Sequence, residues 1–134
     1  MRPLPRLAFP LFLLVGAANT ASAQAPAGRR DPMRIDPAEV DSVRSSTKTA
    51  WDIVQKLRPR FLRPDPRTNC SSAVGQPKIG VVVGGALQGD VSALRRIAAA
   101  EVMAAEFVGG NAAALWYGSD YCLGAIVITS RPAQ

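Results

Sequence analysis

The chain has 134 residues, enough for one small domain, and a formal net charge of +6 at pH 7. It contains no histidine, so the commonest general base of enzymes and a common metal ligand are both missing. We therefore expect a protein that is not an enzyme, with no catalytic residues, no metal site and no cofactor. The remaining enzymatic alternative is a serine–lysine pair built on Ser119, but the spacing singles out no lysine as its base.

Residues 1–23 have the parts of a secretory signal peptide. Arg2 and Arg6 precede an apolar run over 11–15, and small residues at 21–23 mark a cleavage site. The run is too short for a transmembrane helix, so we expect none after cleavage; an uncleaved anchor is the less favoured alternative. Cleavage would leave 14 basic and 10 acidic residues, a net charge of +4. We predict export, with membrane-surface association suiting this charge and nucleic acid an improbable partner.

Residues 24–40 contain alanine and proline without apolar periodicity and predict a flexible linker, so the folded domain is expected over 41–134. The first helix is predicted within 41–62, capped by Ser45, Ser46 or Thr47. Pro59 disfavours helical backbone at Arg58, where this helix should end. One apolar face is formed at helical spacing by Ala50, Ile53, Val54, Leu57 and Phe61.

Four arginines lie within ten residues, at Arg58, Arg60, Arg63 and Arg67. The prolines between them predict an extended, exposed loop rather than a helix. This loop is a candidate basic contact patch. A solvated connector without a binding role is the favoured alternative.

The rest of the chain alternates predicted strands and helices. Residues 79–83 predict a buried strand that runs into a glycine turn at 84–85, and Asp90 should cap a second helix over 91–98. A strand over 102–108, a short helical turn within 109–121 and a strand over 125–129 follow. These elements predict an α/β fold with a small mixed sheet, two main helices and a short third helical turn. The expected core consists of Ile53, Val54, Leu57, Val81, Val83, Leu94, Ile97, Val102, Phe107, Trp116, Ile126 and Ile128.

Short motifs follow one another in a fixed order between residues 94 and 129. Their residues are Leu94, Ile97, Ala105, Glu106, Phe107, Val108, Gly110, Ala113, Tyr117, Gly118, Gly124, Ile126, Ile128 and Thr129. Their order and spacing resemble those of the plug domain of TonB-dependent outer-membrane receptors, and an unrelated small α/β domain with a glycine corner is the alternative. The chain departs from that pattern at Gly84, where the plugs have aspartate. It also departs at Glu106, which should point to the opposite face of its strand from the corresponding acid of the plugs; we expect Glu106 to have a structural role.

The resemblance implies a plug-like module and a location in the periplasm or at the outer membrane of a Gram-negative-type bacterium. Because a receptor barrel needs many strands of about ten residues each, we expect a free-standing module without a barrel. Such a module would bind a protein partner or a surface in the periplasm or at the outer membrane. The alternative from a different class is a secreted domain that binds a small ligand or a polysaccharide through the basic loop.

Cys70 and Cys122 are the only cysteines, and an exported pair is expected to form a disulfide; two free thiols are the alternative. The plug resemblance implies that the strands over 79–83 and 125–129 are neighbours, which would bring the two cysteines to one end of the sheet. We also predict a chain reversal after Tyr117, with Gly118 at positive φ.

Overall fold

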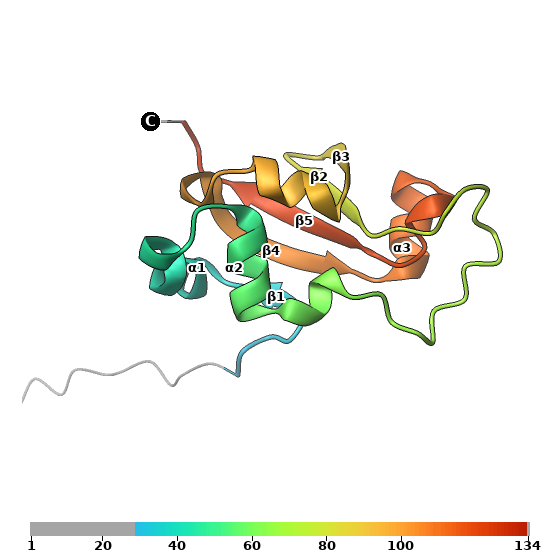
Figure 1. Cartoon of the computed structure of the whole chain (residues 1–134), viewed down its shortest axis with the longest axis horizontal. Coiled ribbons are helices and arrows are strands. Elements are labelled where there is room, and N and C mark those ends of the chain that lie inside the picture. Colours follow the sequence, from blue (N-terminus) through green and yellow to red (C-terminus); the bar gives the residue numbers. More distant parts are fainter. Residues whose placement is uncertain (1–28, 134) are drawn as a thin grey trace, which may run out of the picture.

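The computed structural model describes residues 29–133, so the predicted signal peptide over 1–23 lies outside the described part. A five-stranded mixed sheet in the order β1-β4-β5-β2-β3 forms its centre (Figure 1). β2 and β5 are parallel, and the other neighbouring strands are antiparallel. The predicted α/β class with a small mixed sheet is confirmed. The strands are β1 (Arg34–Ile35), β2 (Gly80–Val83), β3 (Ala86–Asp90), β4 (Val102–Val108) and β5 (Ala125–Ser130).

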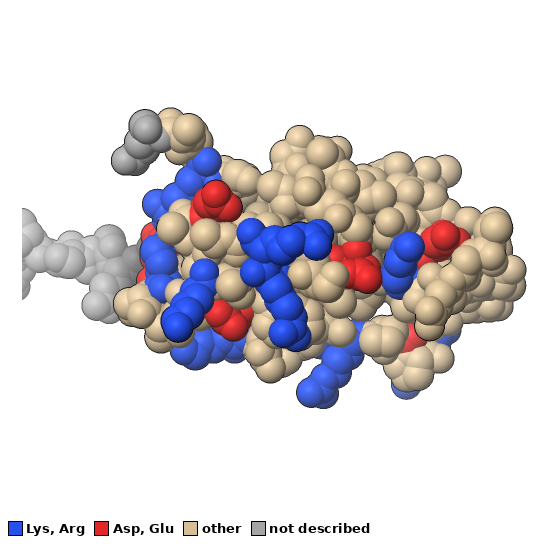
Figure 2. Space-filling view, turned by 45° about the horizontal axis from the view of Figure 1, so that its top comes forward, with Lys and Arg blue, Asp and Glu red and all other residues tan. Residues whose placement is uncertain are grey.

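Three α-helices and five 3-10 turns surround the described sheet. The α-helices are α1 (Pro37–Val43), α2 (Ala50–Leu57) and α3 (Gly110–Tyr117). The 3-10 turns are η1 (Arg44–Ser46), η2 (Pro59–Leu62), η3 (Val91–Arg96), η4 (Ala99–Glu101) and η5 (Ser119–Tyr121). Figure 1 shows α1, α2 and η3 over the sheet and α3 beyond one end of it. Lys and Arg side chains gather on the face that carries α2 and η3 (Figure 2).

The main core lies between the sheet and the layer of α1, α2, η2 and η3. Side chains alternate along each strand, so Val81 and Ile126 point into this core while Val82 and Ala125 point to the other face. There, α3 packs through Ala113 and forms a smaller second cluster. The predicted core residues are buried or half-buried in this way, with one exception. The prediction that Trp116 belongs to the core is wrong, because 62% of this residue is exposed. Helix α3 covers only the end of the sheet, and Trp116 lies on the side of this helix that faces solvent.

The prediction of a flexible linker over 24–40 is wrong from Arg34 onward. Ile35 pairs with Ala105 of β4, and both Ile35 and Val40 are fully buried. The Glu39 carboxylate accepts the Asp36 N–H at 3.2 Å, which stabilises the start of α1. The two-residue strand and seven-residue helix are too short to produce a visible periodicity, so tertiary packing decides their structure.

Helix α2 begins later than predicted. Ser45 and Ser46 lie in η1, and Thr49 is the N-cap: its hydroxyl accepts the Asp52 N–H at 3.4 Å. In return, the Asp52 carboxylate accepts the N–H groups of Lys48 and Thr49, both at 3.0 Å. This reciprocal capping box explains why the helix begins after Thr49 rather than after the earlier hydroxyl residues. Its predicted end at Arg58 is confirmed.

The chain between β2 and β4 contains a strand that the sequence did not predict. Gly84 and Gly85, with φ of +56° and +82°, form a two-residue turn, and β3 returns beside β2. β3 lacks the alternating apolar pattern because it is an exposed edge strand. The following helix starts at Asp90 as predicted, with the Asp90 carboxylate accepting the Ser92 N–H at 2.9 Å, but it is the 3-10 turn η3 rather than an α-helix.

Candidate functional site

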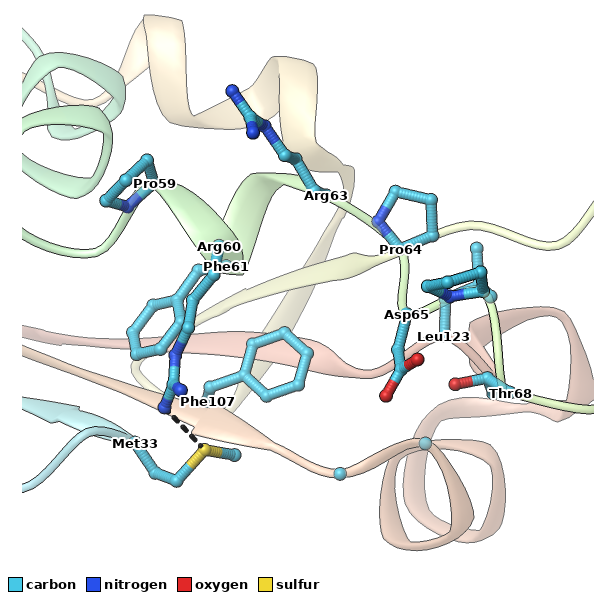
Figure 3. Close-up of a pocket in the computed structure, with 13 residues that line it drawn as sticks. Met33, Pro59, Arg60, Phe61, Arg63, Pro64, Asp65, Thr68, Phe107 and Leu123 are labelled. Carbon is cyan, nitrogen blue, oxygen red and sulfur yellow. Dashed lines mark hydrogen bonds between the residues drawn. The ribbon is translucent and has the colours of Figure 1, made fainter.

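An open cleft of about 690 Å³ lies between the proline-rich loop over 59–68 and the end of β4 (Figure 3). Apolar side chains supply much of its lining, and the start of α3 closes one end. The prediction of a purely extended loop needs one correction, because Pro59–Leu62 form the 3-10 turn η2 before the chain extends. The lining residues are Met33, Pro59, Arg60, Phe61, Arg63, Pro64, Asp65, Pro66, Thr68, Phe107, Gly109, Gly110 and Leu123.

Two phenylalanines from distant parts of the chain meet at the cleft. The ring centroids of Phe61 and Phe107 are 5.2 Å apart with planes tilted by 31°. Phe61 is 1% exposed, whereas Phe107 is half-buried, so part of the pair remains open to a ligand. Burying further apolar surface against such a pair is favourable, at about 25 cal/mol per Å². The sequence identified both residues as apolar, but their meeting depends on the long-range packing of η2 against β4.

Polar groups lie around the apolar part of the cleft. Arg60 extends beside Phe61 toward Met33, donating to the Pro32 carbonyl and approaching the Met33 sulfur at 3.2 Å (Figure 3). Arg63 points away from the cleft, while the Asp65 carboxylate points toward it (Figure 3). The cleft therefore offers an apolar interior with hydrogen-bonding groups of both charges at its margin.

The four loop arginines do not act as one patch. Arg58 is largely buried and binds Glu39 at 3.0 Å, with both side chains 12% exposed. Its guanidinium also donates to the carbonyls of Asp31 and Arg34, which ties the β1 segment to the end of α2. Arg63 and Arg67 are exposed and have no ion pair within residues 29–133. Arg58 thus has a structural role, and the charge available to a partner comes mainly from Arg63 and Arg67.

A disulfide joins the loop to the far side of the cleft. Cys70 and Cys122 are bonded, with their Cα atoms 5.6 Å apart, as expected for an exported pair. β2 and β5 are neighbours, which places both cysteines at the same end of the sheet. Thr68 and Leu123, which line the cleft, lie close to the bridge in sequence. The bridge therefore restrains the position of the loop wall relative to Leu123.

A second contact holds the arm that follows Cys70. The Asp120 carboxylate accepts the N–H groups of Val74 and Gly75 at 3.1 and 2.9 Å. The Asp120 carbonyl accepts the Lys78 N–H at 2.9 Å. Residues 70–78 are thus attached at both ends of the arm, to η5 and to the bridge, and no local pattern in the sequence indicates the role of Asp120.

The motif glycines lie where the chain has little room. A Cβ on Gly110 would be 1.9 Å from the Cys122 carbonyl oxygen, and one on Gly124 would be 2.3 Å from Cζ of Phe107. Gly118, at the C-terminal end of α3, has φ of +116°, which confirms the predicted positive φ. Gly110 and Gly124 thus allow α3, β5 and the cleft wall to approach closely.

Three further motif residues do not line the cleft. Glu106 is exposed and lies opposite Arg34 of β1 on one side and Val127 of β5 on the other. Thr129 is exposed near the end of β5, and Tyr117 packs against the second cluster. These three residues therefore belong to the sheet and to α3 rather than to the cleft.

Comparisons of the chain with models of known protein families, with curated proteins and with solved structures found no match. Within residues 29–133, no group of three His, Cys, Asp or Glu side chains is placed to hold a metal ion. No helix in that same part is both long and apolar enough to cross a membrane.

Proposed function

We propose that this protein is an exported, non-enzymatic plug-like module that binds a protein partner in the periplasm or at the outer membrane, and that the cleft is its contact site. The observation that carries this proposal is the half-buried ring of Phe107, packed against the buried Phe61 beneath the proline-rich loop. A small domain that leaves such a cleft open has a surface suited to one apolar side chain of a partner.

The exposed arginines of the loop favour a partner with acidic residues at the outer edge of the interface, since the Asp65 carboxylate points toward the cleft itself (Figure 3). Arg63 and Arg67 are exposed and free of ion pairs within the described residues, so they can meet carboxylates at the edge of an interface. Charges at an interface rim mainly accelerate association and orient the partner. Binding energy would come chiefly from the apolar anchor.

The motif glycines also support the plug-like part of the proposal. Gly110, Gly118 and Gly124 each occupy a position that disfavours a side chain, by close approach or by backbone conformation. All three glycines are among the residues that resemble the motif of the receptor plugs, and each has a physical reason in this fold.

Site-specific photo-cross-linking in intact cells tests the proposal. A benzoylphenylalanine in place of Pro64, at the cleft (Figure 3), should capture one defined envelope protein. The matched control carries the same group in place of Gln88, an exposed residue of β3. Equal capture from both positions, or none from Pro64, would contradict the proposal. Mass spectrometry of the same protein should find an N-terminus near Gln24, and retention of Met1 would contradict export.

The dimensions of the cleft favour a second candidate, a small apolar ligand. Its volume of about 690 Å³ falls within the range of roughly 300–1,000 Å³ common for small-molecule sites. An apolar fluorescent dye such as anilinonaphthalene sulfonate should then bind the purified chain saturably, with weaker binding in Phe107→Ala. Dye binding that is unchanged in Phe107→Ala would exclude the cleft as a small-ligand site and leave the partner-protein proposal intact.

A further inference from the structure

Charge is distributed unevenly over the described part of the chain. All five of its ion pairs use one of three acids at α1, namely Asp36, Glu39 and Asp41. The exposed basic residues around α2 and η3 have no ion pair within residues 29–133. We call these the α2–η3 face, defined by Lys48, Lys56, Arg95 and Arg96.

Backbone contacts bring the segments that carry these residues together. The Lys48 carbonyl accepts the Ala99 N–H, and the Ala50 N–H donates to the Ile97 carbonyl, both at 2.9 Å. The Arg95 guanidinium lies 4.2 Å from the centroid of the Trp51 ring, in a cation–π contact. Figure 2 shows the resulting gathering of Lys and Arg side chains across this side of the molecule.

Next to these cations lies a shallow hollow of about 280 Å³ lined by five residues with polar or charged side chains, whose aliphatic parts contribute much of the surface. Ser46, Thr47, Asp52, Gln55 and Lys56 form it. Lys56 Nζ donates to Ser46 Oγ at 2.7 Å, and Trp51 Nε1 donates to Gln55 Oε1 at 3.2 Å, so these contacts orient three of the lining side chains. Hydroxyl, amide and carboxylate groups side by side can exchange hydrogen bonds with the hydroxyls of a sugar ring.

We propose that the α2–η3 face binds an acidic polysaccharide. A sugar unit occupies the polar hollow, and the carboxylate or sulfate groups along the polymer meet Lys48, Arg95 and Arg96. This site is separate from the cleft and does not depend on the plug-like proposal.

Two features favour a glycan over an anionic lipid surface. The exposed large apolar residues of the described chain are Met33, Val74, Leu87, Leu115 and Trp116, none of which belongs to the α2–η3 face, so this face has no anchor for an acyl layer. The Asp52 carboxylate in the hollow can accept hydrogen bonds from sugar hydroxyls, which the acyl chains of a lipid layer do not carry. An anionic polysaccharide offers hydroxyl groups to the side chains of the hollow and acidic groups to the surrounding cations.

Binding of the mature chain to polygalacturonate, measured by calorimetry at low and moderate salt, tests this inference. Dextran is the neutral control, and phosphatidylglycerol vesicles and duplex DNA are the competing anions. Arg96→Glu and Lys48→Glu should each weaken polygalacturonate binding by about fivefold, the scale of a lost exposed ion pair. Arg67→Glu makes the same charge change outside the face and should alter binding by less than about twofold.

The hollow is tested separately by Gln55→Ala, which removes a sugar contact without changing the net charge. It should weaken polygalacturonate binding while leaving the affinity for DNA unchanged. Equal losses in Arg67→Glu and Arg96→Glu would show attraction by overall charge alone and overturn the proposal. Tighter binding to vesicles or DNA than to polygalacturonate would also overturn it, as would a Gln55→Ala protein that binds polygalacturonate normally. Unchanged melting temperatures establish that the variants are folded.

Discussion

Single glycines control how closely the elements around the cleft approach one another. At Gly110 the limit is the Cys122 carbonyl oxygen, and at Gly124 it is the ring of Phe107. At Gly118 a Cβ would meet only the Tyr121 ring at an ordinary contact distance of 3.9 Å, but φ of +116° disfavours any residue with a Cβ. Three glycines of one motif are therefore required for two different physical reasons, and substitutions can separate them.

Gly110→Ala should destabilise the protein more than Gly118→Ala does. The first places a methyl group against backbone, an overpacking that costs about 2 kcal/mol or more, while the second costs about 1 kcal/mol or more in backbone strain. Gly109→Ser is the control, because φ is −62°, no atom lies within 4 Å of its Cβ position, and serine suits a helix N-cap. Urea denaturation measures all three, and equal stability of Gly110→Ala and Gly109→Ser would contradict the close approach.

Arg58 should matter for stability because it is the buried member of the arginine loop. Arg58→Ala leaves Glu39 and two backbone carbonyls without their charged donor, which should cost about 2 kcal/mol. Arg67→Ala removes an exposed side chain and should change the free energy of unfolding by less than about 0.5 kcal/mol. If the two variants unfold at the same urea concentration, Arg58 does not tie β1 to α2.

At the scale of elements, local chemistry predicts where helices begin only when the complete cap is considered. Thr49 and Asp52 satisfy each other's backbone groups, which the serines at 45 and 46 cannot do. The N–H groups of Lys48 and Thr49 hold the pKa of Asp52 below its ordinary value. A carboxylate with a depressed pKa stabilises the fold at pH values above its unfolded pKa, and this contribution disappears as pH falls through the folded value.

Asp52→Asn should therefore lower the melting temperature near neutral pH, and the difference from the unmodified protein should shrink as the pH falls below about 4. Circular dichroism melts between pH 2 and 7 measure this difference. A gap that stays constant over the whole range would show that ionisation of Asp52 does not contribute to the cap.

Other elements differ in how well the sequence specifies them. β2, β4 and β5 were predictable because buried β-branched or apolar runs mark them. β1 and β3 were not, because edge strands of two and five residues take their structure from a partner strand. Trp116 was misplaced because an apolar residue on a short helix carries no information about which side of that helix meets the sheet.

For the whole molecule, the Cys70–Cys122 bridge is the main covalent restraint between the loop and the sheet. It closes a sequence separation of 52 residues, for which loop-closure entropy predicts about 4 kcal/mol of stabilisation. Reduction or Cys70→Ser should lower the free energy of unfolding by about 2–4 kcal/mol. Denaturation with and without reductant measures the change; equal midpoints would mean that the Asp120 contacts alone hold the arm.

The candidate site could be predicted only in its parts. Arginines, prolines and cysteines were visible in the sequence, and the pairing of Cys70 with Cys122 followed from there being two cysteines. The cleft itself could not be predicted, because Phe61 and Phe107 are 46 residues apart in the sequence and meet only when η2 packs on β4. The separation of Arg58 from the exposed arginines likewise depends on Glu39, which the predicted linker had placed outside the domain.

The central claim is that the cleft holds an apolar side chain of a partner protein, and a nuclear magnetic resonance titration tests it most directly. The labelled mature chain would be titrated with the protein captured at the Pro64 position. Saturable shifts are expected in amides of residues 59–68, Phe107–Gly110 and Leu123, and Phe107→Ala should weaken binding by tenfold or more, about 1.4 kcal/mol. Shifts confined to β3 or to the exposed side of α3, or unchanged affinity in Phe107→Ala, would contradict the account.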